Sequence, residues 1–404
     1  MLAYIIGVVL FALGICISVA LHEAGHMVAA KSFGMRVRRY FVGFGPTIFS
    51  FRRGETEYGL KAIPLGGFCD IAGMTALDEV TPEESSRAMW RYKVWKRTVV
   101  LAAGSFTHFV LGFVVLYLMA ATMGLPNLEQ KPVASSVSDC VTNAKTVDEV
   151  NNPKCAPGAA GPAKLGGLLP GDEVLSVAGK PTPTWPEMVN VVQEAGGPTR
   201  FEVLRDGQHK TLTVDVPKVE RPFKKDGKDV IMSVGAIGVS ATKNFQYGPI
   251  GAIGGTLSFT GDVFARTWEG LMNFPKRIPA VVNSIFGGER DPDTPISVVG
   301  ASRIGGEAVE AGLWQLFLLL LASLNFFIGV FNLLPLLPLD GGHIAVTWYE
   351  RVRDWIRKLR GRAAGGPVDY TKLSAITVVL VLIGGAVTLL TITADIVNPV
   401  RLMQ

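Results

Sequence analysis

Four long stretches with few charges dominate the pattern of apolar and polar positions along this chain of 404 residues. They cover residues 2–28, 98–124, 313–337 and 373–395. A helix needs about 20 consecutive apolar residues to cross the ~30 Å hydrocarbon core of a bilayer. Each stretch therefore predicts a membrane-spanning helix, and we expect a polytopic α-helical membrane protein.

The first stretch has an alternative interpretation as a cleaved signal peptide, because Ser18-Val19-Ala20 resembles a cleavage site. However, no basic residue precedes it, and it exceeds the usual apolar region of about 7–15 residues. We therefore expect it to be retained as a span.

Basic residues gather in the two segments 31–97 and 343–372, which lie between predicted spans. Lys and Arg near spans stay preferentially in the cytoplasm. This bias predicts that both termini and the segment 125–312 lie outside. The net charge of +5 is explained by this topology, so it gives no reason to expect nucleic-acid binding.

The external segment reads as soluble and folded after an initial polar loop. Residues 173–177, 200–204 and 210–216 are predicted strands, residues 185–195 an amphipathic helix, and Asp206-Gly207 a hairpin turn. With Leu168-Leu169-Pro170-Gly171-Asp172, this pattern resembles a PDZ domain, a module that binds peptides by strand addition. The alternative is a small αβ module that serves as a size-excluding cap.

Two of the four cysteines, Cys140 and Cys155, fall close together in this external segment. An oxidising compartment favours a disulfide between them, and the alternative is two free thiols. After the PDZ-like segment, residues 219–312 mix apolar and charged positions without a spanning run, which predicts helices lying on the outer membrane surface.

The first span ends in His22-Glu23-Ala24-Gly25-His26. Histidines four apart share one helix face and can ligate one Zn²⁺, and the glutamate between them can act as general base on a zinc-bound water. Ionisable groups within a span are costly and tend to mark function. The sequence therefore predicts a zinc hydrolase, which needs a third ligand.

The best third ligand lies in the stretch LNFFIGVFNLLPLLPLDGG, where Pro335, Pro338 and two glycines break the third span around Asp340. The predicted topology brings Asp340 to the depth of His22. Asn325 and Asn332 are seven apart and share a helix face that points to the same region. Glu55 and Glu57 are weaker candidates, since they sit in a charged stretch that reads as a solvated loop.

Taken together, these motifs resemble the site-2 protease family of intramembrane zinc metalloproteases, and in particular the bacterial type with one PDZ domain seen in mycobacteria. The resemblance rests on residues 22–26, Gly43-Phe44-Gly45-Pro46, Thr56 to Phe68, the PDZ pattern and Asn332 to Gly342. It implies that His22, His26 and Asp340 ligate zinc and Glu23 is the base. It also implies that Asn325 and Asn332 help to hold an extended substrate, and that residues 43–68 form re-entrant β structure.

The chain departs from this family in the second span, where Gly104-Ser105-Phe106-Thr107-His108 replaces a Gly-Pro-x-x-Asn pattern. His108 could therefore hydrogen-bond and pack, or have an accessory role near the metal or substrate. His343 is expected near the site without ligating zinc, and His209 on the surface of the PDZ-like segment.

The resemblance implies hydrolysis of a peptide bond within or next to the transmembrane helix of single-pass proteins, such as anti-sigma factors, after a first cleavage. Partners would be these substrates, the bilayer, and a peptide or adaptor at the PDZ-like domain, in the cell membrane. The alternatives are a catalytically silent scaffold and a zinc transporter. The expected organisation is spans at 1–30, 98–124, 313–342 and 373–396; cytoplasmic segments at 31–97 and 343–372; external segments at 125–218 and 219–312; and a tail at 397–404.

Overall fold

A computed structural model describes the whole chain except residues 76–77, 158, 226–227, 292, 367 and 403–404. It divides into two compact units, which we call unit 1 (residues 1–123 and 248–404) and unit 2 (residues 124–247). The elements of unit 1 are α1 (Leu2–Ser32), β1 (Val37–Arg53), β2 (Thr56–Ile71), α2 (Pro82–Ser85), η1 (Met89–Arg91), α3 (Val94–Thr122), α7 (Pro249–Ile285), α8 (Val298–Glu310), α9 (Trp314–Asn332), α10 (Asp340–Leu359) and α11 (Tyr370–Val397).

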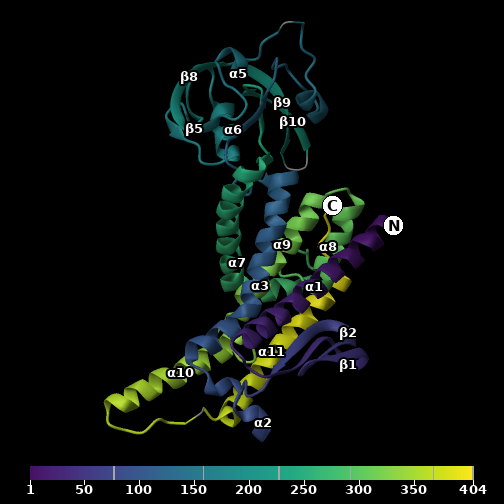
Figure 1. The fold of residues 1–404 in the computed structure, drawn as a ribbon. Helices are drawn as coiled ribbons and strands as arrows, with labels where there is room; N and C mark the ends of the chain where they lie inside the picture. Colours follow the sequence, from purple (N-terminus) through teal and green to yellow (C-terminus); the bar gives the residue numbers. More distant parts are fainter. Residues whose placement is uncertain (76–77, 158, 226–227, 292, 367, 403–404) are drawn as a thin grey trace. The chain divides into compact units, whose positions relative to one another are not determined.

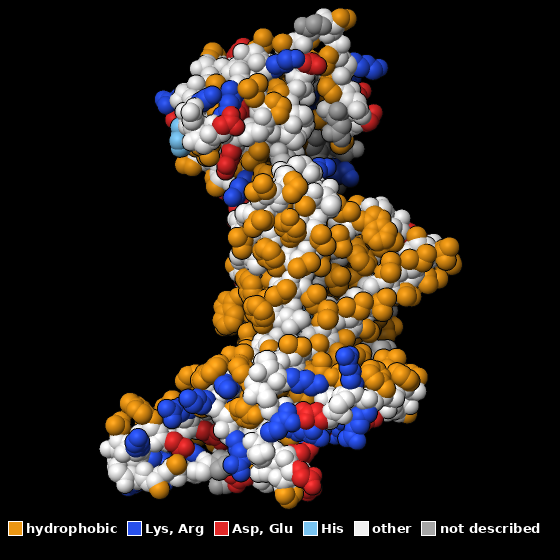
Figure 2. Space-filling view, in the orientation of Figure 1, with side chains coloured by type: hydrophobic (Ala, Val, Ile, Leu, Met, Phe, Trp, Pro, Cys, Tyr) orange, Lys and Arg blue, Asp and Glu red, His pale blue; other side chains and the backbone are white. Residues whose placement is uncertain are grey.

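Four helices of unit 1 are long and apolar enough to cross a membrane: α1, α3, α9 and α11, the last over Leu373–Val397. These are the four predicted stretches, so the prediction of a polytopic α-helical membrane protein is confirmed in this respect. The third helix ends at Asn332, before the two prolines, rather than at residue 337. Exposed apolar side chains spread over the helices of unit 1, and Lys and Arg gather at the end that carries β1, β2, α2 and α10 (Figures 1 and 2).

Small residues let helices of unit 1 approach closely. A Cβ on Gly7 of α1 would lie 2.8 Å from the Gly306 Cα of α8, so neither backbone could come so near with a side chain between them. Next to this contact the buried Phe11 ring packs edge-on against Phe317 of α9, with ring centroids 5.4 Å apart. These contacts join α1 to α8 and α9.

The strands β1 and β2 are long and bent, so that β1 pairs with two parts of β2. Tyr40 pairs with both Cys69 and Tyr58, and Phe41 with both Phe68 and Gly59. The part of β2 at residues 67–71 therefore has a β1 neighbour on one side, and among the described strands it has none on the other. The predicted β-rich region is present. Its exposed apolar side chains are those that suit contact with lipid, namely Phe44, Ile48, Phe49, Phe51, Leu60 and Ile63.

Unit 2 is built around a four-stranded antiparallel sheet in the order β6-β5-β7-β8. Its core includes Leu168, Val177, Met188 of α6, Phe201 and Val214. The elements of unit 2 are β3 (Leu125–Pro126), β4 (Ala134–Val137), α4 (Val147–Asn151), α5 (Pro162–Leu165), β5 (Glu173–Val177), β6 (Lys180–Pro181), α6 (Trp185–Glu194), β7 (Gly197–Arg205), β8 (Gln208–Val216), β9 (Lys218–Lys225), β10 (Lys228–Gly235), β11 (Val239–Ala241) and β12 (Asn244–Phe245).

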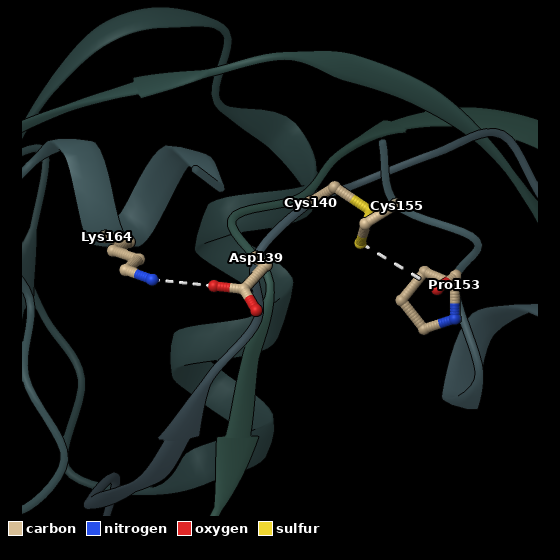
Figure 3. Close-up of a disulfide and its surroundings, with 5 residues drawn as sticks. All are labelled: Asp139, Cys140, Pro153, Cys155 and Lys164. Carbon is tan, nitrogen blue, oxygen red and sulfur yellow. Dashed lines mark hydrogen bonds and ion pairs between the residues drawn. A yellow bond between two sulfur atoms is a disulfide. The ribbon is translucent and has the colours of Figure 1, made fainter. Parts of the chain in front are cut away.

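Cys140 and Cys155 form a disulfide in unit 2, so the pairing expected from an oxidising compartment is the one found (Figure 3). Beside it, the Asp139 carboxylate accepts a hydrogen bond of 2.7 Å from Lys164 of α5. The bridge closes the segment between β4 and α5 on itself, and the ion pair attaches this segment to α5.

Two segments differ from the sequence-based boundaries. Unit 2 continues past residue 218 to Tyr247, because β11 pairs with β4 and β12 pairs with β3. The segment 343–372, expected as a basic loop, forms helix α10 over most of its length. Between them, α8 packs against α1, and the predicted position of α7 and α8 on the outer membrane surface stays a prediction.

Candidate metal centre and catalytic site

The side chains of His22, His26 and Asp340 meet at one point in unit 1. The two histidine Nε2 atoms are 3.1 Å apart, and each lies 3.3 Å from Asp340 Oδ2. Donor atoms about 2.0 Å from a tetrahedral ion lie about 3.3 Å from one another, so the spacing fits a zinc ion with one position left open. Both histidines are buried, and the three donors are of the types that zinc takes in hydrolases.

Helix geometry places the two histidines, and a helix start places the aspartate. His22 and His26 are one turn apart on α1, and Asp340 is the first residue of α10. A carboxylate in the first turn is favoured by the helix dipole. Gly341 is required after it, since a Cβ there would collide with the Leu333 carbonyl at the end of α9.

A hydrogen bond from the other ring nitrogen fixes His26. Its Nδ1 lies 2.8 Å from the Val100 carbonyl oxygen of α3. A carbonyl only accepts, so Nδ1 carries the proton and the Nε2 lone pair faces the other two donors. The Nδ1 of His22 is buried and has no hydrogen-bond partner within the described residues.

Glu23 lies against the β2 segment that has an open side. A Cβ on Gly67 would lie 3.2 Å from the Cγ of Glu23, so this side chain packs against the β2 backbone. The carboxylate is half-buried and follows His22 directly in the chain. The position combines a candidate base with a strand edge that can pair with an extended chain.

Gly104 of α3 lies directly against the two histidine rings. A Cβ on this residue would meet His26 Nε2 and would lie 2.6 Å from His22 Cε1 and 2.7 Å from His22 Nε2. Gly25 has the matching role on α1, since its Cβ would lie 2.7 Å from the Ala103 carbonyl oxygen. Sequence reasoning missed Gly104 as a site residue. Its signals in the sequence are a glycine inside a long helix, which often marks a close approach, and its match to the first position of the family's Gly-Pro-x-x-Asn pattern.

His108 is fully buried one turn beyond Gly104, with its ring centroid 5.0 Å from that of His22. Its Nδ1 lies 2.9 Å from Asn325 Oδ1, and the Asn325 Nδ2 donates to the Leu321 carbonyl at 2.9 Å. Both polar atoms of Asn325 are therefore engaged inside the protein. Asn332 is half-buried at the end of α9.

The weaker candidates lie elsewhere. Glu55 pairs with Arg87 and Arg36 at 2.6 and 2.5 Å, and the hydrogen bonds from Arg87, then those from Arg36, outweigh burial and lower the pKa of this carboxyl. His343 is half-buried and stacks on Tyr370, with centroids 6.1 Å apart. His209 lies on the β8 strand of unit 2 and is exposed.

Comparison with known proteins agrees with this donor set. A family model described as peptidase family M50 matches residues 10–376. The chain belongs to peptidase family M50. It is 50% identical over 408 residues to the zinc metalloprotease Rip1 of Mycolicibacterium smegmatis, with 99% of both chains covered. Zinc metalloproteases Rip1 of Mycobacterium bovis and Mycobacterium tuberculosis are 48% and 47% identical over 406 residues, with 99% of this chain and 100% of theirs covered.

Membership of M50, the site-2 protease family, makes the chain a zinc metalloprotease with Zn²⁺ as its cofactor. The predicted resemblance and the predicted enzyme class are thereby confirmed, and the alternatives of a silent scaffold and a zinc transporter lose their support. With four candidate spans, this M50 member is a membrane protease.

Proposed function

We propose that the chain hydrolyses a peptide bond within or next to the transmembrane helix of single-pass membrane proteins. In this proposal His22, His26 and Asp340 hold zinc and Glu23 is the general base. The observation that carries it is the tetrahedral spacing of the three donor atoms at 3.1 to 3.3 Å, with a carboxylate beside them on a membrane-spanning helix.

Zinc at this position supplies a Lewis acid for the scissile carbonyl and lowers the pKa of a bound water. Glu23 takes a proton from the attacking water and returns it to the leaving nitrogen. The β2 backbone at Gly67 lies against Glu23, and Val100 keeps the His26 ring in the ligating tautomer.

The substrate must unwind before this chemistry, because a helix hides its carbonyls in hydrogen bonds from residue i to i−4. Each backbone group freed in hydrocarbon costs several kcal/mol unless it finds a partner. We assign that role to the open side of β2 at residues 67–71, next to Glu23, and to the half-buried Asn332. Asn325 would act from behind, through its hydrogen bond with His108.

We infer a location in the cell membrane with the termini and unit 2 outside the cytoplasm. The basic residues of 31–97 and 343–372, which lie at one end of unit 1, support this orientation (Figure 2). Unit 2 then acts as a PDZ-like domain that binds a peptide or adaptor and admits substrates trimmed by an earlier cleavage, such as anti-sigma factors. Its four-stranded sheet packed by α6 and its disulfide are consistent with an external module.

The test is the Glu23→Gln variant, purified in detergent and reconstituted with a single-pass substrate. The proposal requires loss of cleavage by at least about 100-fold with zinc still bound, because the variant removes the base and keeps the ligands. His22→Ala should lose both zinc and cleavage, which provides the matched control. Cleavage by Glu23→Gln at the parent rate would refute the assignment, and uncleaved partners that co-purify with this variant would identify substrates.

A further inference from the structure

Helix α10 carries an apolar face that the described part of the chain leaves largely exposed, beside the site already described. Large apolar side chains recur on it every three or four residues and are 37–68% exposed: Trp348, Tyr349, Val352, Trp355, Ile356 and Leu359. This spacing puts them on one side of the helix. Two tryptophans and a tyrosine exposed on one face are unusual for a surface in water, whereas these residues are enriched at the membrane–water boundary.

Basic side chains border this apolar face. Arg351 and Lys358 are two turns apart and both exposed along one edge, and the exposed Arg360 follows at the end of the helix near the other edge. Two further arginines are tied down within the protein, since Arg353 bonds Asp354 and Arg357 donates to the Ala363 carbonyl. Arg351, Lys358 and Arg360 have no side-chain partner among the described residues, so the cations left free are those next to the apolar side of α10.

The middle of α10 is fixed at the end of a candidate membrane span. Glu350 Oε2 lies 3.5 Å from Arg97 Nη1, and the Trp348 indole donates to Thr98 Oγ1 at 3.1 Å. Arg97 and Thr98 belong to the first two turns of α3, where a charged residue marks the boundary between hydrocarbon and water. Beyond these contacts α10 projects away from the other helices of unit 1 (Figure 1).

We propose that α10 lies in the membrane–water interface and binds anionic phospholipid, with its apolar side among the acyl chains and Arg351, Lys358 and Arg360 at the lipid phosphates. A basic amphipathic helix with Trp and Leu on its apolar side has the composition of such interfacial helices. The exposed apolar side chains favour contact with a second apolar surface. The flanking cations favour a negatively charged lipid surface over an apolar protein surface.

The consequence for the site follows from the first residue of α10, which is Asp340. A lipid that holds α10 also holds the carboxylate assigned to zinc. This consequence rests on the proposed function, whereas the lipid contact does not. The experiment therefore measures the helix itself and remains valid if the zinc assignment fails.

The experiment compares hydrogen exchange of residues 351–359 in the full-length protein, in nanodiscs of phosphatidylcholine alone or mixed with phosphatidylglycerol. Phosphatidylglycerol should slow exchange by about 100-fold, since each of the three basic residues near an anionic surface contributes about fivefold. Arg351→Gln/Lys358→Gln should lose about 25-fold of this protection. Lys145→Gln/Lys210→Gln, which removes the same charge from exposed positions in unit 2, should lose none.

A second measurement places the apolar side. The fluorescence of Trp355 is obtained as the difference between the parent protein and the Trp355→Phe variant. Brominated acyl chains should quench this fluorescence. Equal exchange in both lipids, or an unquenched Trp355, would overturn the proposal. Slow exchange of residues 351–359 that appears only in nanodiscs holding two copies of the protein would overturn the proposal, because a second chain would then contact the apolar side of α10.

Discussion

Gly104→Ala tests whether the approach of α3 to the candidate zinc ligands is as tight as the structure has it. The added Cβ would lie 2.7 Å from His22 Nε2 and 2.6 Å from His22 Cε1, and it would also meet His26 Nε2. Non-bonded heavy atoms prefer about 3.5–4.0 Å, so the overlap is about 1 Å. Both rings carry candidate ligands, so one helix or both imidazoles must move by a similar amount.

A displacement of that size is large for a metal site. Ligand distances must hold to about 0.2 Å, and changes beside the ligands cost about 10–100-fold in metal affinity. We expect Gly104→Ala to weaken zinc binding by about 100-fold and to lower cleavage at limiting zinc to a similar degree. Zinc affinity is measured by competition with a chromophoric chelator, and the bound metal by elemental analysis.

The matched control is Gly112→Ala on the same helix. Its Cβ would lie 2.7 Å from the Phe326 ring, so it creates a comparable clash away from the three donors. This variant should be less stable but should keep its zinc affinity. Stoichiometric zinc at parent affinity in Gly104→Ala would refute the geometry of the site, and equal zinc loss in both variants would mean that the effect is general misfolding.

The remaining predictions concern His108 and unit 2. His108→Ala leaves the buried Asn325 oxygen without its hydrogen-bond partner, which lowers the free energy of unfolding by about 1–3 kcal/mol. The variant should cleave more slowly with its zinc content unchanged. Loss of zinc would instead make His108 a ligand. Asp172 is fully buried and accepts hydrogen bonds of 2.6 and 2.7 Å from Arg205. Burial alone would raise the pKa of this carboxyl. The hydrogen bonds from Arg205 and from the Leu169 N–H outweigh burial and lower the pKa. Because the folded-state pKa lies below the unfolded value of about 3.9, this pair stabilises unit 2 above about pH 4 and is lost as the pH falls through the folded pKa. Asp172→Asn should therefore lower the free energy of unfolding of unit 2 by about 3 kcal/mol at neutral pH. Hydrogen exchange of unit 2 in the full chain measures this loss. A loss that stays the same in acid would contradict the ion pair.

The parts of the site that the sequence predicted are those set by local geometry. His22 and His26 had to share a face if residues 2–28 were helical, and the prolines and glycines around Asp340 had to end the third span. Their convergence followed from counting spans, because the chain crosses the membrane twice between His22 and Asp340, and two crossings return it to the same side. The structure brings these three side chains together, while their roles as ligands remain a proposal.

What sequence reasoning missed depends on how elements pack. The hydrogen bond from His26 to Val100 and the approach of Gly104 exist only because α1 and α3 are in contact. The strands of residues 218–245 were missed because residues 219–312 were expected to form helices on the outer membrane surface. The pairing of β11 with β4 and of β12 with β3 is not local, so a local pattern does not show it.

The error at α10 is of a different kind, because its signal was present in the sequence. Charge led us to expect a basic loop at 343–372, although Trp348, Val352, Trp355 and Leu359 recur with the period of a helix. Counting charges finds the side of the membrane on which a segment lies, and apolar periodicity finds whether that segment is ordered at the surface. For this chain the two properties belong to one helix. Arg351, Lys358 and Arg360, which are among the basic residues used to orient the protein, are thus the ones that we expect to bind the lipid surface.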